Sequence, residues 1–107
     1  MEKGKKAKLE KAGWRVGSAE EFLGLTLEET EIVELRIRLS NALRSRRSTL
    51  GWSQSQLAKT IRSSQSRIAK MEAADTTVSI DLLVRGLLST GIGLDGLSKI
   101  VGSKAAR

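Results

Sequence analysis

The chain has 107 residues, 19 basic and 12 acidic side chains, and a formal net charge of +7. It contains no Cys, His or Pro, which excludes disulfides, thiol chemistry, zinc sites built from Cys or His, and catalytic triads that depend on His. The length predicts one domain with a single modest core, and the sequence shows neither a secretory signal nor the roughly 18 apolar residues of a membrane span. We therefore expect a cytoplasmic protein that is not an enzyme and uses no cofactor or metal.

The charges are segregated along the chain. Residues 1–15 carry six basic and two acidic side chains, and residues 16–35 carry six glutamates and no basic residue. Residues 36–70 contain no acid and nine basic residues: Arg36, Arg38, Arg44, Arg46, Arg47, Lys59, Arg62, Arg67 and Lys70. Such a cationic block is typical of a protein that neutralises nucleic-acid phosphates, and a solvated basic face is the alternative interpretation.

The first third of the chain contains two predicted helix starts. Residues 13–17 are expected to be irregular or extended, and Ser18 with Glu21 forms a capping box for a brief helix that ends at Gly24. Thr26 with Glu29 forms a second box, which opens a long helix from residue 27 to about 48. The predicted buried stripe of this helix consists of Ile32, Leu35, Leu39, Ala42 and Leu43, widened by Val33 and Ile37. This width predicts cover on two sides, by later helices and by residues 14–25, whose Trp14 and Phe22 are expected in the core.

Residues 51–74 have the pattern of two short helices joined by a tight turn. Ser53 and Gln56 form an S-x-x-Q capping box that predicts the first helix, and Ser64 is placed to cap a second one from Gln65 to about Ala73. Apolar residues at helical spacing give each helix one buried side, formed by Leu57, Ala58 and Ile61 in the first and by Ile68 and Met71 in the second.

The opposite side of the second helix is polar and suits the DNA major groove. It carries Ser66, Ala69, Lys70 and Ala73, with Gln65 and Arg67 at its flanks. A Gln amide pairs with adenine through two hydrogen bonds, Lys reaches guanine, Ser bonds either kind of base edge, and the Ala methyl can contact thymine. We therefore expect this helix to recognise a DNA sequence.

These residues make the segment similar to the helix-turn-helix of the Cro and Xre-type phage-repressor family. The similarity includes the W-S-Q opening at 52–54, the Leu57-Ala58 pair, the S-Q-S-R-I run at 64–68, and Glu72. It implies a phosphate contact for Gln54, base contacts at the start of the second helix, and an all-α, compact five- to six-helix lambda-repressor-like domain at 27–107 (motif 53–73) after an N-terminal arm and short helix at 1–26. The expected DNA-binding residues are Gln54, Lys59, Arg62, Ser64, Gln65, Ser66, Arg67, Ala69, Lys70, Arg46 and Arg47. The family often has glycine where Arg62 and Ala74 stand here.

The C-terminal third is predicted to complete the core. Ser79 is expected to cap a helix over 80–88, with Leu83, Leu87 and Leu88 buried. Residues 91–96 match G-x-G-x-x-G, but no strand precedes them, so we interpret them as a loop before a last helix at 94–101. The apolar face of that helix is the expected homodimer interface, formed by Leu94, Leu97, Ile100 and Val101.

Two functions are open at this stage. The first is a dimeric, sequence-specific transcriptional regulator on a palindromic operator. Residues 9–39 resemble Xre-type antitoxins (HigA-like) of toxin-antitoxin pairs, which implies an antitoxin and autorepressor with a small basic ribonuclease toxin as partner. The toxin would be attracted by Glu20, Glu21, Glu28, Glu29, Glu31 and Glu34. The alternative is a protein-interaction module that neutralises a partner without binding DNA, against which the intact polar face of the second helix argues.

Overall fold

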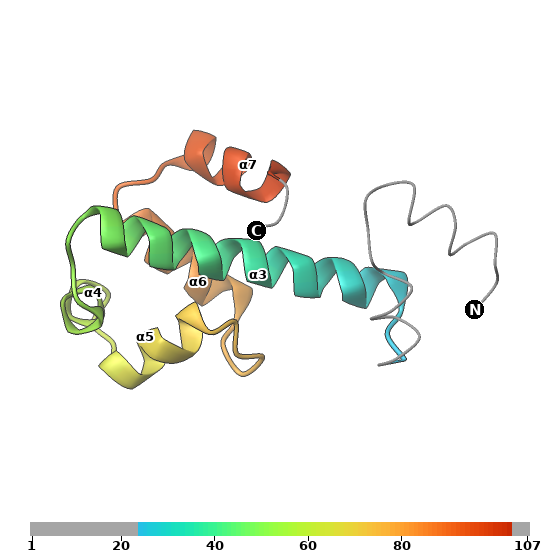
Figure 1. Ribbon diagram of the computed structural model, residues 1–107, viewed down its shortest axis with the longest axis horizontal. Helices are drawn as coiled ribbons and strands as arrows, with labels where there is room; N and C mark the ends of the chain where they lie inside the picture. The colour runs from blue at the N-terminus through green and yellow to red at the C-terminus, as the bar shows by residue number, and fades with distance from the viewer. Residues whose placement is uncertain (1–23, 104–107) are drawn as a thin grey trace. The chain divides into compact units, whose positions relative to one another are not determined.

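The computed structural model describes residues 24–103, within which the chain forms five helices and no strand (Figure 1). The helices are α3 (Leu27–Thr49), α4 (Gln54–Thr60), α5 (Gln65–Glu72), α6 (Ile80–Ser89) and α7 (Leu94–Gly102). None of these helices is long and apolar enough to cross a bilayer. The all-α prediction is confirmed, whereas the predictions for residues 13–23, including the Ser18 capping box, Trp14 and Phe22, lie outside the described residues.

Close packing divides the chain into two units, residues 1–34 and 35–107, with the division inside α3. In the first unit the predicted capping box is present: the Thr26 amide donates to Glu29 Oε1 at 2.8 Å, and the Glu29 amide donates to Thr26 Oγ1 at 3.1 Å. Ile32 and Val33 were predicted to be buried but are 50% and 43% exposed. Both residues precede the part of α3 that packs into the core, which begins at Leu35.

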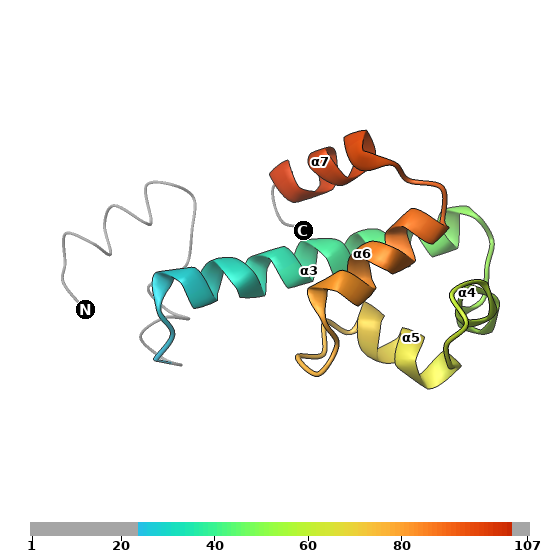
Figure 2. The same ribbon diagram turned by 180° about the vertical axis from the view of Figure 1, so that it is seen from behind.

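The core of the second unit lies where α3 from Leu35 onward meets the other four helices. Its buried apolar residues are Leu39, Leu43, Leu57, Ala58, Ile61, Ile68, Met71, Val78, Leu83 and Leu87. Figures 1 and 2 show α7 on one side of α3 and the α4–α5 pair on the opposite side. Gly86 lets α6 approach closely, because a Cβ at this position would lie 3.0 Å from Met71 Cε and 3.3 Å from Leu43 Cδ1.

The predictions for the C-terminal helices agree with the structure only in part. Leu88 was predicted to be buried but is 44% exposed, because the neighbouring Leu87, about 100° away around α6, takes the core side. The glycine-rich residues 91–93 do form a loop before α7, as predicted. On α7 the expected interface residues separate: Leu97 and Ile100 pack against the core, whereas Leu94 and Val101 are 79% and 45% exposed.

Three successive helices end in the same way. After α3, α4 and α5, the chain passes through the left-handed region at Gly51 (φ 72°), Arg62 (φ 57°) and Ala74 (φ 58°). In each case the next amide donates to the carbonyl five residues earlier: Trp52 N to Arg47 O at 3.1 Å, Ser63 N to Ala58 O at 2.8 Å, and Asp75 N to Lys70 O at 3.1 Å. This is the Schellman pattern, which usually places glycine at the left-handed residue. A side chain there costs about 1–2 kcal/mol, so Arg62 and Ala74 are strained positions at either end of α5.

Candidate nucleic-acid interface

The segment from Ser53 to Ala73 forms two capped helices with a short turn between them. Ser53 makes the reciprocal capping box with Gln56 that the sequence predicts, and the Ser64 hydroxyl accepts the Arg67 amide at 3.1 Å. The predicted buried sides of both helices are confirmed, since Leu57 and Ile68 are each 0% exposed. The buried stripes hold α4 against α5 and leave the outer side of α5 free.

A chain of polar contacts connects the start of α5 to the end of α3. Gln65 Nε2 donates to Gln54 Oε1 at 2.6 Å, and Gln54 Nε2 donates to Glu72 Oε1 at 3.1 Å. Glu72 in turn accepts hydrogen bonds from Arg47 Nε and Nη2 at 2.5 and 3.0 Å. Arg47 Nη1 donates to the carbonyl of Trp52 at 2.8 Å. The hydrogen bond to Glu72 raises the pKa of Arg47 above its ordinary value, with burial acting against it. This network fixes where the Gln54 and Gln65 amides point.

Gln65 keeps the hydrogen-bonding groups that a base contact requires. Its side-chain amide has two N–H donors and one oxygen, and the contact with Gln54 uses a single N–H. The remaining N–H and the oxygen are the pair that a Gln uses for adenine N7 and N6. Along the same side of α5, Ser66, Lys70 and Ala73 are exposed and Ala69 is partly exposed, so the structure brings the predicted polar face together.

The nine basic residues of the cationic block divide into two groups. Four hold α3 from Arg36 onward to the rest of its unit: Arg36 donates to the carbonyls of Val78 and Asp75, Arg38 to Val101 O, Arg46 to Thr90 O, and Arg47 to Glu72. Arg46 and Arg47, which the sequence placed among the DNA contacts, are therefore partly buried and engaged within the fold. The sequence-based prediction for these two residues rested only on their positive charge. Charge alone does not distinguish a cation that lies on the surface from one that binds a carbonyl at a helix end.

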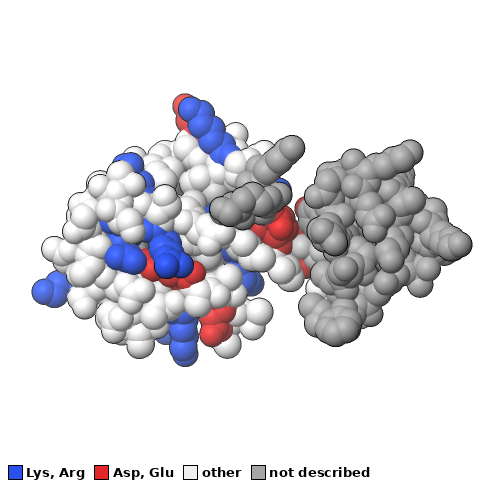
Figure 3. Space-filling view, in the orientation of Figure 1, with Lys and Arg blue, Asp and Glu red and all other residues white. Residues whose placement is uncertain are grey.

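The other five, Arg44, Lys59, Arg62, Arg67 and Lys70, are exposed, and none of their side chains makes a hydrogen bond or ion pair within the described residues. Figure 3 shows basic side chains at the left edge, over α4, and at the lower edge, toward α5. Cations without protein partners are the ones available to phosphates. Four of the five are predicted contact residues, and they lie on α4, in the turn after it and on α5.

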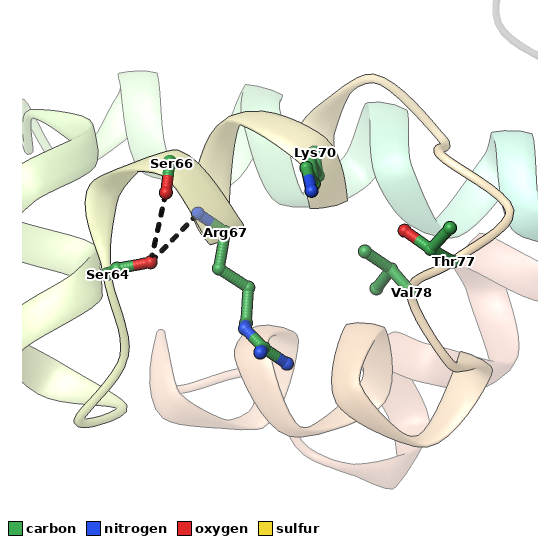
Figure 4. Close-up of a pocket in the computed structure, with 6 residues that line it drawn as sticks. All are labelled: Ser64, Ser66, Arg67, Lys70, Thr77 and Val78. Carbon is green, nitrogen blue, oxygen red and sulfur yellow. Dashed lines mark hydrogen bonds between the residues drawn. The ribbon is translucent and has the colours of Figure 1, made fainter.

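A hollow of about 280 Å³ borders this face and was not predicted. It is lined by Ser64, Ser66, Arg67, Lys70, Thr77 and Val78. Figure 4 shows Arg67 and Lys70 on α5, with Thr77 and Val78 across from them on the loop to α6. The sequence feature that could have indicated the loop beside this hollow is D-x-T at 75–77, because Asp side chains commonly bond the amide two residues later in a turn. Here Asp75 Oδ1 accepts from Thr77 N and Oγ1 at 2.8 and 2.6 Å.

The fold and this arrangement of side chains define a helix-turn-helix DNA-binding domain. The Helix-turn-helix family model matches residues 43–97, just over half of the chain, and the protein belongs to this Cro/C1-type family. It is accordingly a DNA-binding transcription regulator with a lambda-repressor-like fold. No curated protein and no solved structure matches the chain.

Proposed function

We propose that the protein recognises a specific DNA sequence through the outer side of α5. Gln65, Ser66 and Ala69 would contact base edges, while Gln54, Lys59 and Arg62 contact phosphates. The observation that carries this proposal is the preorganised Gln65 amide. One of its N–H groups donates to Gln54, while the second N–H and the oxygen make no hydrogen bond within residues 24–103.

Selection of bound duplexes from a random DNA pool tests the proposal. The full chain should enrich one consensus, and fluorescence anisotropy should then show tighter binding to that duplex than to a scrambled one. Typical specific sites are bound about 10³-fold or more tighter than unrelated sequences. Equal binding to both duplexes would show that the protein binds DNA without recognising its sequence, and it would refute the proposal.

We further propose that the protein acts as a two-fold dimer on a palindromic operator. Leu94 and Val101 supply exposed apolar surface on α7, and a second copy would remove it from water. The two α5 helices would then lie about 34 Å apart, one turn of B-DNA. Sedimentation of the wild type and of Leu94→Ser with Val101→Ser decides this, with Leu88→Ser as the control because Leu88 is an exposed leucine on α6. A dimer that persists in the double variant removes α7 from the interface.

We also propose the antitoxin and autorepressor role, with a small basic ribonuclease toxin as the partner. Residues 16–35 carry six glutamates and no cation. On the first turns of α3, Glu28, Glu29 and Glu31 are exposed next to the exposed Ile32 and Val33. An apolar centre with an acidic rim complements a cationic protein, because the rim speeds encounter and the centre supplies buried apolar area.

Purification of the full chain from its native cells, followed by mass spectrometry of what copurifies, tests this role. We expect a small basic protein that is lost from Ile32→Ser with Val33→Ser and retained by the control Leu88→Ser. Capture by both variants would place the contact elsewhere. A partner captured by a chain that selects no duplex would favour the alternative, a module that neutralises its partner without binding DNA.

A further inference from the structure

The hollow between α5 and the loop to α6 has a different chemistry from the base-contacting side of α5. Its lining has two cations, three hydroxyl side chains and one apolar residue, Val78. In Figure 4 the Arg67 side chain extends from α5 along one side of the hollow, and Lys70 lies between it and Thr77. Cations from one helix therefore face a loop across a concave surface.

Several hydrogen-bond donors around the hollow are uncommitted. The side chains of Arg67 and Lys70 make no hydrogen bond or ion pair within the described residues. The Ser64 and Ser66 hydroxyls share one contact of 3.3 Å, and whichever of them donates, the other keeps its hydrogen free. A guanidinium, an ammonium and one hydroxyl hydrogen are thus available for an acceptor with several oxygens.

The loop that closes the hollow is held in place. Arg36 donates to the carbonyls of Val78 and Asp75, and Asp75 Oδ1 accepts both the amide and the hydroxyl of Thr77. The Thr77 hydrogen bonds lower the pKa of Asp75, and the nearby charges of Lys70 and Arg36 lower it further. Asp75 is consequently an anion near Lys70, and its negative charge repels a negatively charged ligand in the hollow.

We propose that this hollow binds a phosphoryl group. A tetrahedral anion with three or four oxygens matches a fork-shaped guanidinium beside an ammonium and a hydroxyl. A volume of about 280 Å³ lies just below that of drug-sized ligand sites and accommodates a small phosphorylated molecule. Two sources offer this chemistry: a free phosphorylated small molecule, or a phosphate of bound DNA.

The proposal gives Lys70 a role that competes with its predicted contact to guanine. An ammonium drawn into the hollow by a phosphoryl group is withdrawn from the base-contacting side of α5. A free phosphorylated molecule in the hollow would therefore lower the affinity for DNA by occupying two of the five cations that have no protein partner in the described part of the chain. This inference concerns the flank of α5 and does not require that α5 recognises a sequence.

Titration of the full chain with inorganic pyrophosphate, followed by amide NMR, tests the first source. We expect saturable shifts confined to residues 64–78, weakened in Arg67→Gln and Lys70→Gln by up to about fivefold each, as for an exposed charge pair. Asp75→Asn should bind more tightly, since Asn keeps the oxygen that Thr77 bonds and removes the opposing charge. Arg44→Gln is the matched control and should bind as the wild type does, because Arg44 is an exposed arginine outside the hollow with no partner among the described residues.

Anisotropy on duplex DNA at graded salt tests the second source. If a DNA phosphate occupies the hollow, Arg67→Gln and Lys70→Gln should weaken binding to all duplexes alike and make the log-log salt slope shallower by about 0.9 for each lost contact. The free phosphorylated molecule is identified as the source by two results in the wild type: pyrophosphate shifts the amide signals of the hollow, and it displaces DNA. Neither effect should occur in the double variant Arg67→Gln with Lys70→Gln.

The proposal is overturned if pyrophosphate gives no saturable shift at the hollow and both variants keep the wild-type salt slope. A Lys70→Gln variant that loses a guanine from its selected consensus, with the slope unchanged, assigns Lys70 to bases and excludes a DNA phosphate as the source. The proposal is then overturned unless pyrophosphate gives a saturable shift at the hollow. A chain that binds pyrophosphate at the hollow but binds no duplex would instead retain this inference and refute the proposed sequence recognition.

Discussion

Arg47 near the end of α3 and Glu72 at the end of α5 form a two-pronged ion pair, with Nε 2.5 Å from Oε2 and Nη2 3.0 Å from Oε1. The side chains are 17% and 5% exposed. Because Glu72 also accepts from Gln54, which accepts from Gln65, one carboxylate connects the scaffold to the side chain proposed to contact bases. The pair therefore contributes to both stability and the orientation of Gln65.

We expect Arg47→Met to lower the free energy of unfolding by about 3 kcal/mol, because it leaves the nearly buried Glu72 carboxylate without a cation. Arg47→Lys should lose less, although an ammonium cannot donate to both carboxylate oxygens and the Trp52 carbonyl in the same geometry. Urea denaturation measures the change. The exposed Arg44→Met is the control and should stay within about 0.5 kcal/mol of the wild type. Equal losses in the two Met variants would contradict a special role for the pair.

The strained turns predict substitutions that stabilise the protein. Glycine removes about 1–2 kcal/mol of left-handed strain and costs about 0.5–1 kcal/mol of additional chain entropy in the unfolded state. Ala74→Gly and Arg62→Gly should therefore each raise the free energy of unfolding by up to about 1.5 kcal/mol. Ala73→Gly, one residue earlier at an ordinary φ of −91°, should lower it by about 0.5–1 kcal/mol. Thermal or urea unfolding of the three variants is the measurement, and the same sign at residues 73 and 74 would show that strain is absent.

Two neighbouring leucines on α6 should differ sharply in their contribution to stability. Leu87→Ala removes a fully buried side chain and should cost about 2–5 kcal/mol. Leu88→Ala removes one that is 44% exposed and should cost less than about 1 kcal/mol. Chemical denaturation of both variants measures the difference. Similar losses would mean that Leu88 is buried in the native assembly.

Base and phosphate contacts should separate in selection experiments. Gln65→Ala should relax the consensus at one position, with about 1–3 kcal/mol of discrimination lost, because the free N–H and oxygen of Gln65 are removed. Lys59→Ala should weaken binding to all sequences alike, since a phosphate contact carries no base information. Selection from a random duplex pool, repeated with each variant, provides the comparison. An unchanged consensus in Gln65→Ala would show that α5 lies in the groove in another orientation.

Binding should weaken steeply as salt is added. About five phosphate contacts per dimer give a log-log slope near −0.9 per contact, so about −4 or steeper. Within residues 24–103 of each chain, the five exposed cations without a protein partner are sufficient for this number. Anisotropy between about 50 and 200 mM salt measures the slope. Binding that does not change over this range would refute a phosphate-dominated interface.

Local sequence determined the helices and the turn that carries function. The capping boxes at Thr26 and Ser53 and the cap at Ser64 are contacts between residues three apart, so neighbouring side chains suffice to define where α3, α4 and α5 begin. Apolar spacing likewise placed Leu57 and Ile68 in the core, because helical periodicity makes one side of each helix apolar.

Tertiary structure decided which of two chemically similar residues is buried, paired or free. Leu87 and Leu88 are identical in type, and only the position of α3 and α5 beside α6 determines which of them is covered. Arg47 and Arg62 contribute equal charge to the cationic block, but one meets Glu72, 25 residues away, and the other remains in solvent. Partners so distant in sequence are brought together by packing of the whole unit, which a periodic pattern in a single helix does not encode.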